Sequence, residues 1–217
     1  MAQATNACPV VFLHGYSGEA ESLRQFAQYH SGSKVICINL PGFGGTPLPP
    51  QVAIDNFEQY CELVWQSIRK VLPSGKVKLV GHSYGAMITF ALACRHAEDV
   101  ETIDLHGPVA SPRLAPRLIV STVRLARRLH LPLAPLIRLF KQPVIIDVVT
   151  RFMLRPEWSN GVKQRIIALR RHEASYYSVG MFEIMGQALE FRSAMKYSHC
   201  IVPARICYAT DDNVAGK

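Results

Sequence analysis

The fold is decided by the stretch Val80-Gly81-His82-Ser83-Tyr84-Gly85-Ala86. A short apolar run ends at Val80 and a long apolar run begins at Ala86, which predicts a strand, a sharp turn and a buried helix. At such a corner the pattern G-x-S-x-G can hold a serine exposed, beside a base and facing N–H donors. Gly81 and Gly85 fit because a Cβ at either position would clash where strand and helix approach closely. An ordinary tight turn without chemistry is the alternative for the pentapeptide alone.

Two further motifs precede this turn. Pro9-Val10-Val11-Phe12-Leu13-His14-Gly15-Tyr16 is an apolar run that ends in His-Gly, and Asn39-Leu40-Pro41-Gly42-Phe43-Gly44-Gly45-Thr46 follows another apolar run. In this order and at this spacing, the three motifs resemble the α/β-hydrolase superfamily. Within it, the sequence is most similar to small carboxylesterases and related hydrolases that carry a helical cap. The motifs lie in the first half of the chain, and a weaker match runs from Ala204 to Asp212.

Strands alternate with helices along this first half. Continuous apolar runs predict buried strands at residues 9–13, 35–40, 76–80 and 100–105. Helical spacing predicts helices at residues 18–30, 55–72 and 86–94, the second with Asp55 as its N-cap. Such alternation implies parallel strands with right-handed crossovers, so the fold class is α/β with a mostly parallel sheet flanked by helices. Ligands of such sheets bind at the carboxyl ends of the strands, where Ser83 falls.

Residues 111–198 break the alternation. They contain several prolines and helical stretches at residues 118–129 and 162–171. We therefore expect a hydrolase core over residues 1–110, a helical cap inserted after the fourth strand over residues 111–198, and the core continued over residues 199–217 with the strand and loop that bear the catalytic acid.

The basic residues concentrate in the cap. Residues 111–200 contain fifteen Lys and Arg against five acids, whereas the other residues contain nine against eleven, so the whole net charge of +8 belongs to this segment. A basic surface could attract anionic substrates or an anionic membrane face, which leaves peripheral membrane contact open. The alternative is that Arg124 and Arg127, which alternate with Leu125, solvate amphipathic helices. Nucleic-acid binding is not expected, because no recognisable binding module is present.

Composition predicts a reduced domain without cofactors. The six cysteines form no C-x-x-C pair and no histidine stands at zinc-finger spacing, which favours free thiols and no metal. Residues 1–7 have neither a basic flank nor an apolar core, and no uncharged apolar run reaches the length of about eighteen residues that a membrane-spanning helix needs. We expect cytoplasmic localisation.

The resemblance also implies the roles of individual residues. Ser83 would be the nucleophile on a nucleophile elbow, and the main-chain N–H groups of Tyr16 and Tyr84 would form the oxyanion hole. The acid would be Asp212, with Asp211 as the alternative. The loops would be shaped, without proton transfer, by His14, Gly15, Gly81, His82 and Gly85.

The base is the difficulty. Superfamily members follow the order serine, acid, histidine, but only residues 213–217 follow Asp212, and none of them is histidine. We expect either a fragment of a longer hydrolase or a natural short form, in both cases C-terminally incomplete. His106, after the fourth strand, is the alternative base. An incomplete sheet should expose an edge at residues 204–208 and favour self-association.

Two functions stay open from the sequence. The first is a serine hydrolase that acts on ester, thioester or amide-like bonds of a small or lipid-like substrate through a Ser83 acyl-enzyme. The second is a catalytically weak or inactive relative that serves as a ligand-binding or interaction protein. The intact serine turn favours the first, and the missing histidine favours the second.

Overall fold

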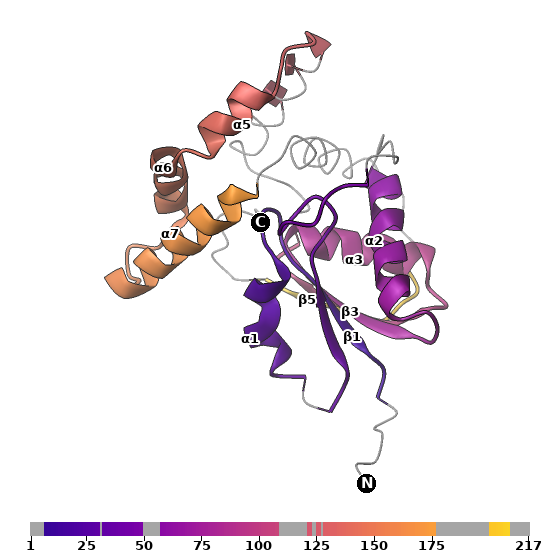
Figure 1. Cartoon of the computed structure of the whole chain (residues 1–217). Helices are drawn as coiled ribbons and strands as arrows, with labels where there is room; N and C mark the ends of the chain where they lie inside the picture. The colour runs from indigo at the N-terminus through magenta and orange to yellow at the C-terminus, as the bar shows by residue number, and fades with distance from the viewer. Residues whose placement is uncertain are drawn as a thin grey trace.

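The structure is a computed structural model that describes residues 7–30, 32–49, 57–108, 121–122, 125–126, 128–176 and 200–208. It has the predicted α/β architecture, with a parallel sheet and helices on both of its faces (Figure 1). The strands are β1 (Val10–Leu13), β2 (Val35–Ile38), β3 (Val77–His82), β4 (Val100–His106) and β5 (Ala204–Cys207). Their order in the sheet is β2-β1-β3-β4-β5, and all four pairings are parallel.

The most apolar strand lies inside the sheet, as its composition predicts. Val11 of β1 pairs with Ile36 on one side and Leu79 on the other. All four residues of β1 are buried, because helices cover both faces of the sheet. The predicted strands are confirmed, and β3 and β4 each extend to a histidine at the carboxyl end.

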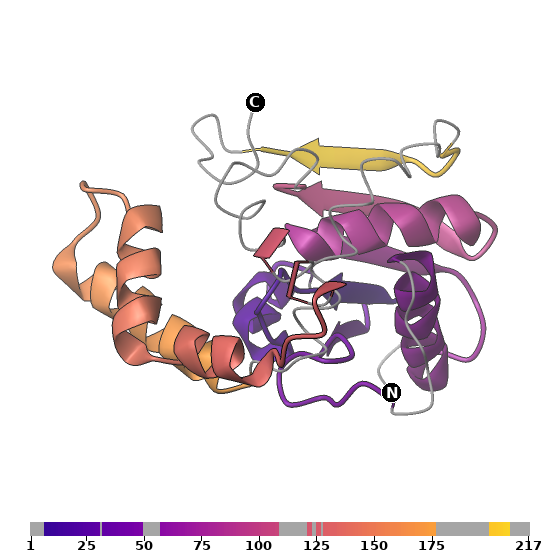
Figure 2. The ribbon, with the colours of Figure 1, turned by 90° about the horizontal axis from the view of Figure 1, so that it is seen from above.

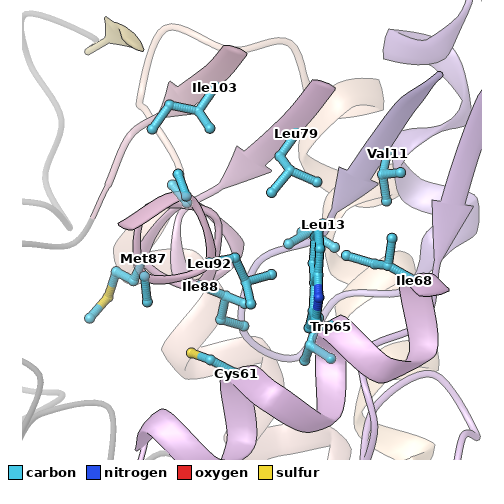
Figure 3. Close-up of a cluster of buried hydrophobic side chains, with 14 of the residues drawn as sticks. Val11, Leu13, Cys61, Trp65, Ile68, Leu79, Met87, Ile88, Leu92 and Ile103 are labelled. Carbon is cyan, nitrogen blue, oxygen red and sulfur yellow. The ribbon is translucent and has the colours of Figure 1, made fainter. Parts of the chain in front are cut away.

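One face of the sheet is covered by α2 (Phe57–Val71) and α3 (Tyr84–Arg95). Helix α2 is amphipathic and buries its apolar side against α3 and the strands, whereas α3 is buried on nearly all sides. Figure 3 shows the resulting cluster, in which Trp65 and Ile68 of α2 meet Leu13 of β1. The helix predicted at residues 86–94 begins earlier, at Tyr84, because the carbonyl oxygen of Ser83 accepts its first hydrogen bonds.

The opposite face carries much shorter helices than predicted. Residues 18–30 form a 3-10 turn, η1 (Ala20–Leu23), and a single helical turn, α1 (Arg24–Ala27). Leu23 is buried against Val10, Phe12 and Val80, but Phe26, three positions along the chain, is 60% exposed. One buried side chain supplies too little apolar contact to stabilise a longer helix, since short helices depend on tertiary packing.

Three helices lie between β4 and β5 in the chain: α5 (Ala134–Phe140), α6 (Pro143–Met153) and α7 (Asn160–Ser175). Pro135 and Pro143 stand in the first turns of α5 and α6, where the missing N–H costs nothing, and the Ser159 hydroxyl caps α7. Figure 2 shows these helices on the side to which β4 and β5 point. The helix expected at residues 162–171 is confirmed within α7.

Several sequence predictions fall outside the described residues. They are the N-cap Asp55, half of the residues of the helix at 118–129, and both boundaries of the segment 111–198. Where the chain is described, β5 pairs with β4 alone and leaves Ile206 exposed, as expected for a sheet edge. All six cysteines are free thiols. None of the described helices combines the length and apolarity needed to cross a bilayer.

Candidate active site

Ser83 stands at the junction of β3 and α3 in a strained backbone conformation. Its φ is 54° and its ψ is −113°, a region that costs an L-residue on the order of 1–3 kcal/mol. Its N–H donates to the carbonyl oxygen of His106 at 2.8 Å, and its own carbonyl oxygen accepts from the N–H of Ala86 at 3.1 Å and of Met87 at 3.4 Å. The strain is therefore held from both sides, by β4 and by the first turn of α3.

The two glycines of the turn permit this approach of strand and helix. A Cβ on Gly81 would overlap the Gly85 carbonyl oxygen and the Thr89 hydroxyl, and would lie 2.6 Å from the Ala86 Cα. A Cβ on Gly85 would overlap the carbonyl oxygen of Leu13. The sequence prediction that neither position tolerates a side chain is confirmed.

The loop after β1 packs directly on this turn. A Cβ on Gly15 would lie 3.3 Å from the Ser83 Cβ and 3.0 Å from Nδ1 of His82. His82 is exposed, and it pairs in register with His106 of β4. The loop after β1, the turn after β3 and the end of β4 thus meet at the carboxyl end of the sheet.

The ring of His14 is fully buried and joins the loop after β1 to the loop after β2. Its Nδ1 is 2.8 Å from the Gly15 carbonyl oxygen, which can only accept, and its Nε2 is 3.0 Å from the Leu40 N–H, which can only donate. The ring is therefore neutral, with its proton on Nδ1. Burial lowers the pKa of His14 from 6.5 to about 4. The expectation that His14 shapes the loops without proton transfer agrees with this geometry.

Hydrogen bonds fix the orientation of the two peptide groups that bear the expected oxyanion donors. The carbonyl oxygen of Gly15 accepts from His14 and also from the Gly18 N–H at 3.0 Å. That of Ser83 accepts from the first turn of α3. Because C=O and N–H point in opposite directions across a trans peptide, the N–H groups of Tyr16 and Tyr84 point away from these partners.

The rings of Tyr16 and Tyr84 lie in an aromatic cluster beside the turn. Tyr84 is buried and packs against Tyr16 and Tyr60, with ring centroids 6.0 Å and 6.2 Å away. Phe43 contributes an edge contact to Tyr16 at 5.5 Å. Burial raises the pKa of Tyr84 well above its ordinary value, so its phenol stays neutral. The hydroxyl of Tyr84 has no hydrogen-bond partner among the described residues.

Helix α7 reaches the loop after β1, a contact that sequence reasoning missed. Nη1 of Arg170 donates to the Ser17 hydroxyl at 3.2 Å and to Oε2 of Glu173 at 2.8 Å. Ser17 has a positive φ of 59°, and it directly follows Tyr16. Glu173 is only 4% exposed, and burial raises the pKa of its carboxyl group. No local signal announces a contact between residues 153 positions apart.

The second contact of α7 involves its C-terminal end. Nε2 of His172 lies 3.4 Å from Oε1 of Glu19 in the same loop. After α7, the ring of Tyr176 covers Gly45, where a Cβ would come within 3.3 Å of it. The helix thus touches the loops after β1 and β2, and both loops contribute to the candidate site.

The expected acids, Asp212 and its alternative Asp211, lie outside the described residues. Strand β5, which precedes them, ends beside the site, since Cys207 pairs in register with His106 and accepts from the Gly107 N–H at 2.8 Å. His106, the alternative base, contacts Ser83 through its main-chain carbonyl group. Over the described part of the chain, no group of three His, Cys, Asp or Glu side chains could hold a metal ion.

Comparisons with known proteins agree with the fold. A sequence model of the alpha/beta hydrolase fold family matches residues 9–128, more than half of the chain, and the protein therefore belongs to this family. Over 129 residues it is 28% identical to the probable lysophospholipase BODYGUARD 4 of Arabidopsis thaliana, a match that covers 58% of this chain and 30% of that protein.

Two further similarities come from bacterial proteins. The chain is 30% identical over 101 residues to the 2-succinyl-6-hydroxy-2,4-cyclohexadiene-1-carboxylate synthase of Escherichia coli, covering 43% of this chain and 37% of the synthase. Its fold superposes on a thermophilic esterase from Thermogutta terrifontis with a TM-score of 0.68 at 19% identity, covering 96% of this chain and 74% of the esterase. The matches to the two curated relatives span about a third of their length.

Proposed function

We propose that the protein is a serine hydrolase of carboxylesterase type, in which Ser83 forms an acyl-enzyme with the carbonyl group of a small or lipid-like ester. The observation that carries the proposal is the strained turn of Ser83, which the glycine contacts and the His106 hydrogen bond hold against the loop of Gly15. Backbone strain of this kind concentrates at functional sites, because it lowers stability and persists where the conformation serves a function.

In this proposal the Ser83 hydroxyl attacks the ester carbonyl carbon while a base takes its proton. The negative charge that develops on the carbonyl oxygen is stabilised by the N–H groups of Tyr16 and Tyr84, whose peptide planes are fixed by hydrogen bonds. The alcohol then leaves with a proton, and water hydrolyses the acyl-enzyme. Asp212 would orient the base, and Asp211 is the alternative.

A lipid-like ester is supported by the relatives. One relative is named as a lysophospholipase and one solved structure as an esterase. We propose that α5–α7 form a cap, since α7 contacts the loops of Ser17 and Gly45 beside the site.

The first test is covalent labelling of Ser83 by a fluorophosphonate, followed by intact-mass measurement. The reagent adds one group to an activated serine, so we expect one adduct on the native chain and none on Ser83→Ala. Ser22→Ala, a substitution of another serine outside the turn, serves as the matched control and should label like the native chain. Absence of labelling both in the folded native chain and in a folded chain extended with a histidine-bearing loop would favour the alternative, a non-catalytic member of the family.

The second test identifies the base. If His106 acts as the base, His106→Ala should lower both labelling and hydrolysis of short aryl esters as strongly as Ser83→Ala does. Loss of a triad base removes about four to six powers of ten, because only the oxyanion donors and binding remain. If the base comes from a segment after Lys217, a chain extended with a histidine-bearing loop should be active, and His106→Ala should leave that activity unchanged.

A further inference from the structure

Helix α6 exposes valines to solvent. Val144 and Val148, which are four positions apart and so share one face, are both exposed. The buried side of α6 holds Ile146 and Thr150, and Asp147 binds Arg171 of α7 through two hydrogen bonds. A water-facing helix usually turns polar side chains to solvent, so the exposed valines of α6 depart from that pattern.

The exposed apolar side chains continue on both neighbours of α6. Helix α6 contacts α5 and α7, and Figure 2 shows the three helices together at one side of the molecule. We call residues 128–176, which contain α5, α6 and α7, the helical arm. Its further exposed apolar and aromatic residues are Leu129, Leu131, Leu139, Val149, Trp158, Val162, Leu169 and Tyr176. Exposed apolar side chains therefore occur on all three helices of the arm, and large exposed apolar areas are typical of interaction surfaces.

The helical arm is also strongly basic. It contains nine Lys and Arg and three acids, which gives a net charge of +6. Each of the acids binds an arginine: Asp147 binds Arg171, Glu157 binds Arg155 and Glu173 binds Arg170. The positive charge that remains is carried by exposed or half-buried side chains, namely Arg128, Arg138, Lys141, Arg151, Lys163 and Arg165. The arm therefore combines exposed valines and leucines with excess positive charge.

We propose that the helical arm docks on the surface of an anionic lipid bilayer, with Val144 and Val148 at the level of the acyl chains. Apolar side chains flanked by Lys and Arg are the pattern that binds such surfaces, because the bilayer offers both hydrocarbon and negative charge. A second copy of the chain is a poorer occupant, since two arms of charge +6 repel each other. The proposal does not depend on the chemistry of Ser83.

The test is co-sedimentation of the 217-residue chain with lipid vesicles. Phosphatidylcholine vesicles that contain phosphatidylglycerol should bind the chain, and vesicles of pure phosphatidylcholine should bind it much more weakly. Binding should fall as salt is added, because ions screen the attraction between the arm and the lipid headgroups. Ser83→Ala should bind like the native chain, which separates this proposal from the proposed hydrolase.

Two variants, each with a matched control, locate the surface. Val148→Glu should weaken binding by about tenfold or more, whereas Val71→Glu at the end of α2 should not; the two valines are 47% and 49% exposed. The double variant Arg138→Glu with Arg151→Glu should weaken binding to the vesicles by about tenfold or more. Its control is Lys70→Glu with Lys76→Glu, which changes the net charge equally but lies outside the arm, and this control should bind like the native chain. Thermal melts check that all variants fold.

Three outcomes would overturn the proposal. The first is absence of vesicle binding by the folded native chain. The second is equal loss of binding in the arm variants and in their controls, which would indicate attraction by net charge alone. The third is a dimer in gel filtration that Val148→Glu dissociates, without vesicle binding, which would assign the valines of α6 to contact between two copies of the chain.

Discussion

The turn around Ser83 and the helical arm differ in how tightly they are packed. At the turn, main-chain atoms of β1, β3 and α3 touch, and a single added methyl group would collide with backbone on Gly81 or Gly85. On the arm, valines face outward, and a Cβ on Gly161 of α7 would meet nothing within 4 Å. Close backbone contacts therefore fix the conformation of the turn. The arm, in contrast, leaves apolar surface exposed that a binding partner could cover.

The largest expected effect tests this contrast with the same substitution in both regions. Gly85→Ala should lower the free energy of unfolding by about 3 kcal/mol or more, because its Cβ overlaps the Leu13 carbonyl oxygen and backbone must move. Gly161→Ala should raise it by up to about 1 kcal/mol, since alanine favours a helix and the space is open. Urea unfolding of both variants measures the difference, and similar effects at the two sites would contradict the contrast.

Acid should weaken the turn through His14. Its pKa is about 4 in the folded chain against 6.5 ordinarily, so the unfolded chain binds the proton more readily. The stabilisation is complete above pH 6.5 and is lost as the pH falls from 6.5 toward about 4, by up to about 3 kcal/mol. Urea unfolding at several pH values measures this slope.

The control for the acid experiment is His14→Gln, because glutamine cannot titrate. In this variant the free energy of unfolding should fall less steeply between pH 6.5 and about pH 4. On the arm the sign is opposite, because burial raises the pKa of Glu173, which favours the protonated carboxyl group in the folded chain. Glu173→Gln should therefore steepen the loss of stability in acid. If the free energy of unfolding depends on pH in the same way in both variants and in the native chain, other groups control that dependence.

A smaller effect is expected where the two regions touch. Arg170→Gln should lower the free energy of unfolding by about 1–2 kcal/mol, because it leaves the buried Glu173 without its ion-pair partner and Ser17 without its donor. Arg171→Gln, one position along α7, removes an exposed pair within the arm and should cost less. An equal loss from both variants would mean that the contact with Ser17 does not hold α7 to the core.

The smallest effect concerns the backbone strain of Ser83. Ser83→Gly should be more stable than Ser83→Ala by about 1 kcal/mol, because glycine accepts a φ of 54° that strains alanine as much as serine. Thermal unfolding of the two variants measures the difference, and both should lack hydrolase activity. Equal stability would show that the turn imposes no strain.

The strands, the long helix α2 and the turn glycines could be predicted from sequence, because each follows from local physics. A continuous apolar run such as residues 10–13 has few places to lie except inside a parallel sheet. The two turn glycines likewise follow from the close approach of strand and helix. The short helix α1 was mispredicted, because helical spacing does not tell how much of a face finds a partner.

The packing of α6 and α7 could not be predicted, because it depends on contacts between residues far apart in the sequence. The bond from Arg170 to Ser17 spans 153 positions, and nothing near either residue indicates the other. Helix α6 was not predicted, and apolar spacing would not tell whether its valines face inward or outward. The acids Asp211 and Asp212 stay predictions of the resemblance, since they lie outside the described residues.

The neutral ring of His14 has an electronic consequence for the peptide group that follows it. The Leu40 N–H polarises the ring through Nε2, and the ring in turn withdraws electron density from the Gly15 carbonyl oxygen through Nδ1–H. Chains of hydrogen bonds strengthen one another in this way by roughly 10–30% per bond. The amide hydrogen at the far end of that peptide, on Tyr16, is therefore more acidic than an isolated amide. His14 takes no part in proton transfer in the proposed reaction, yet its hydrogen bonds make the Tyr16 N–H a stronger donor.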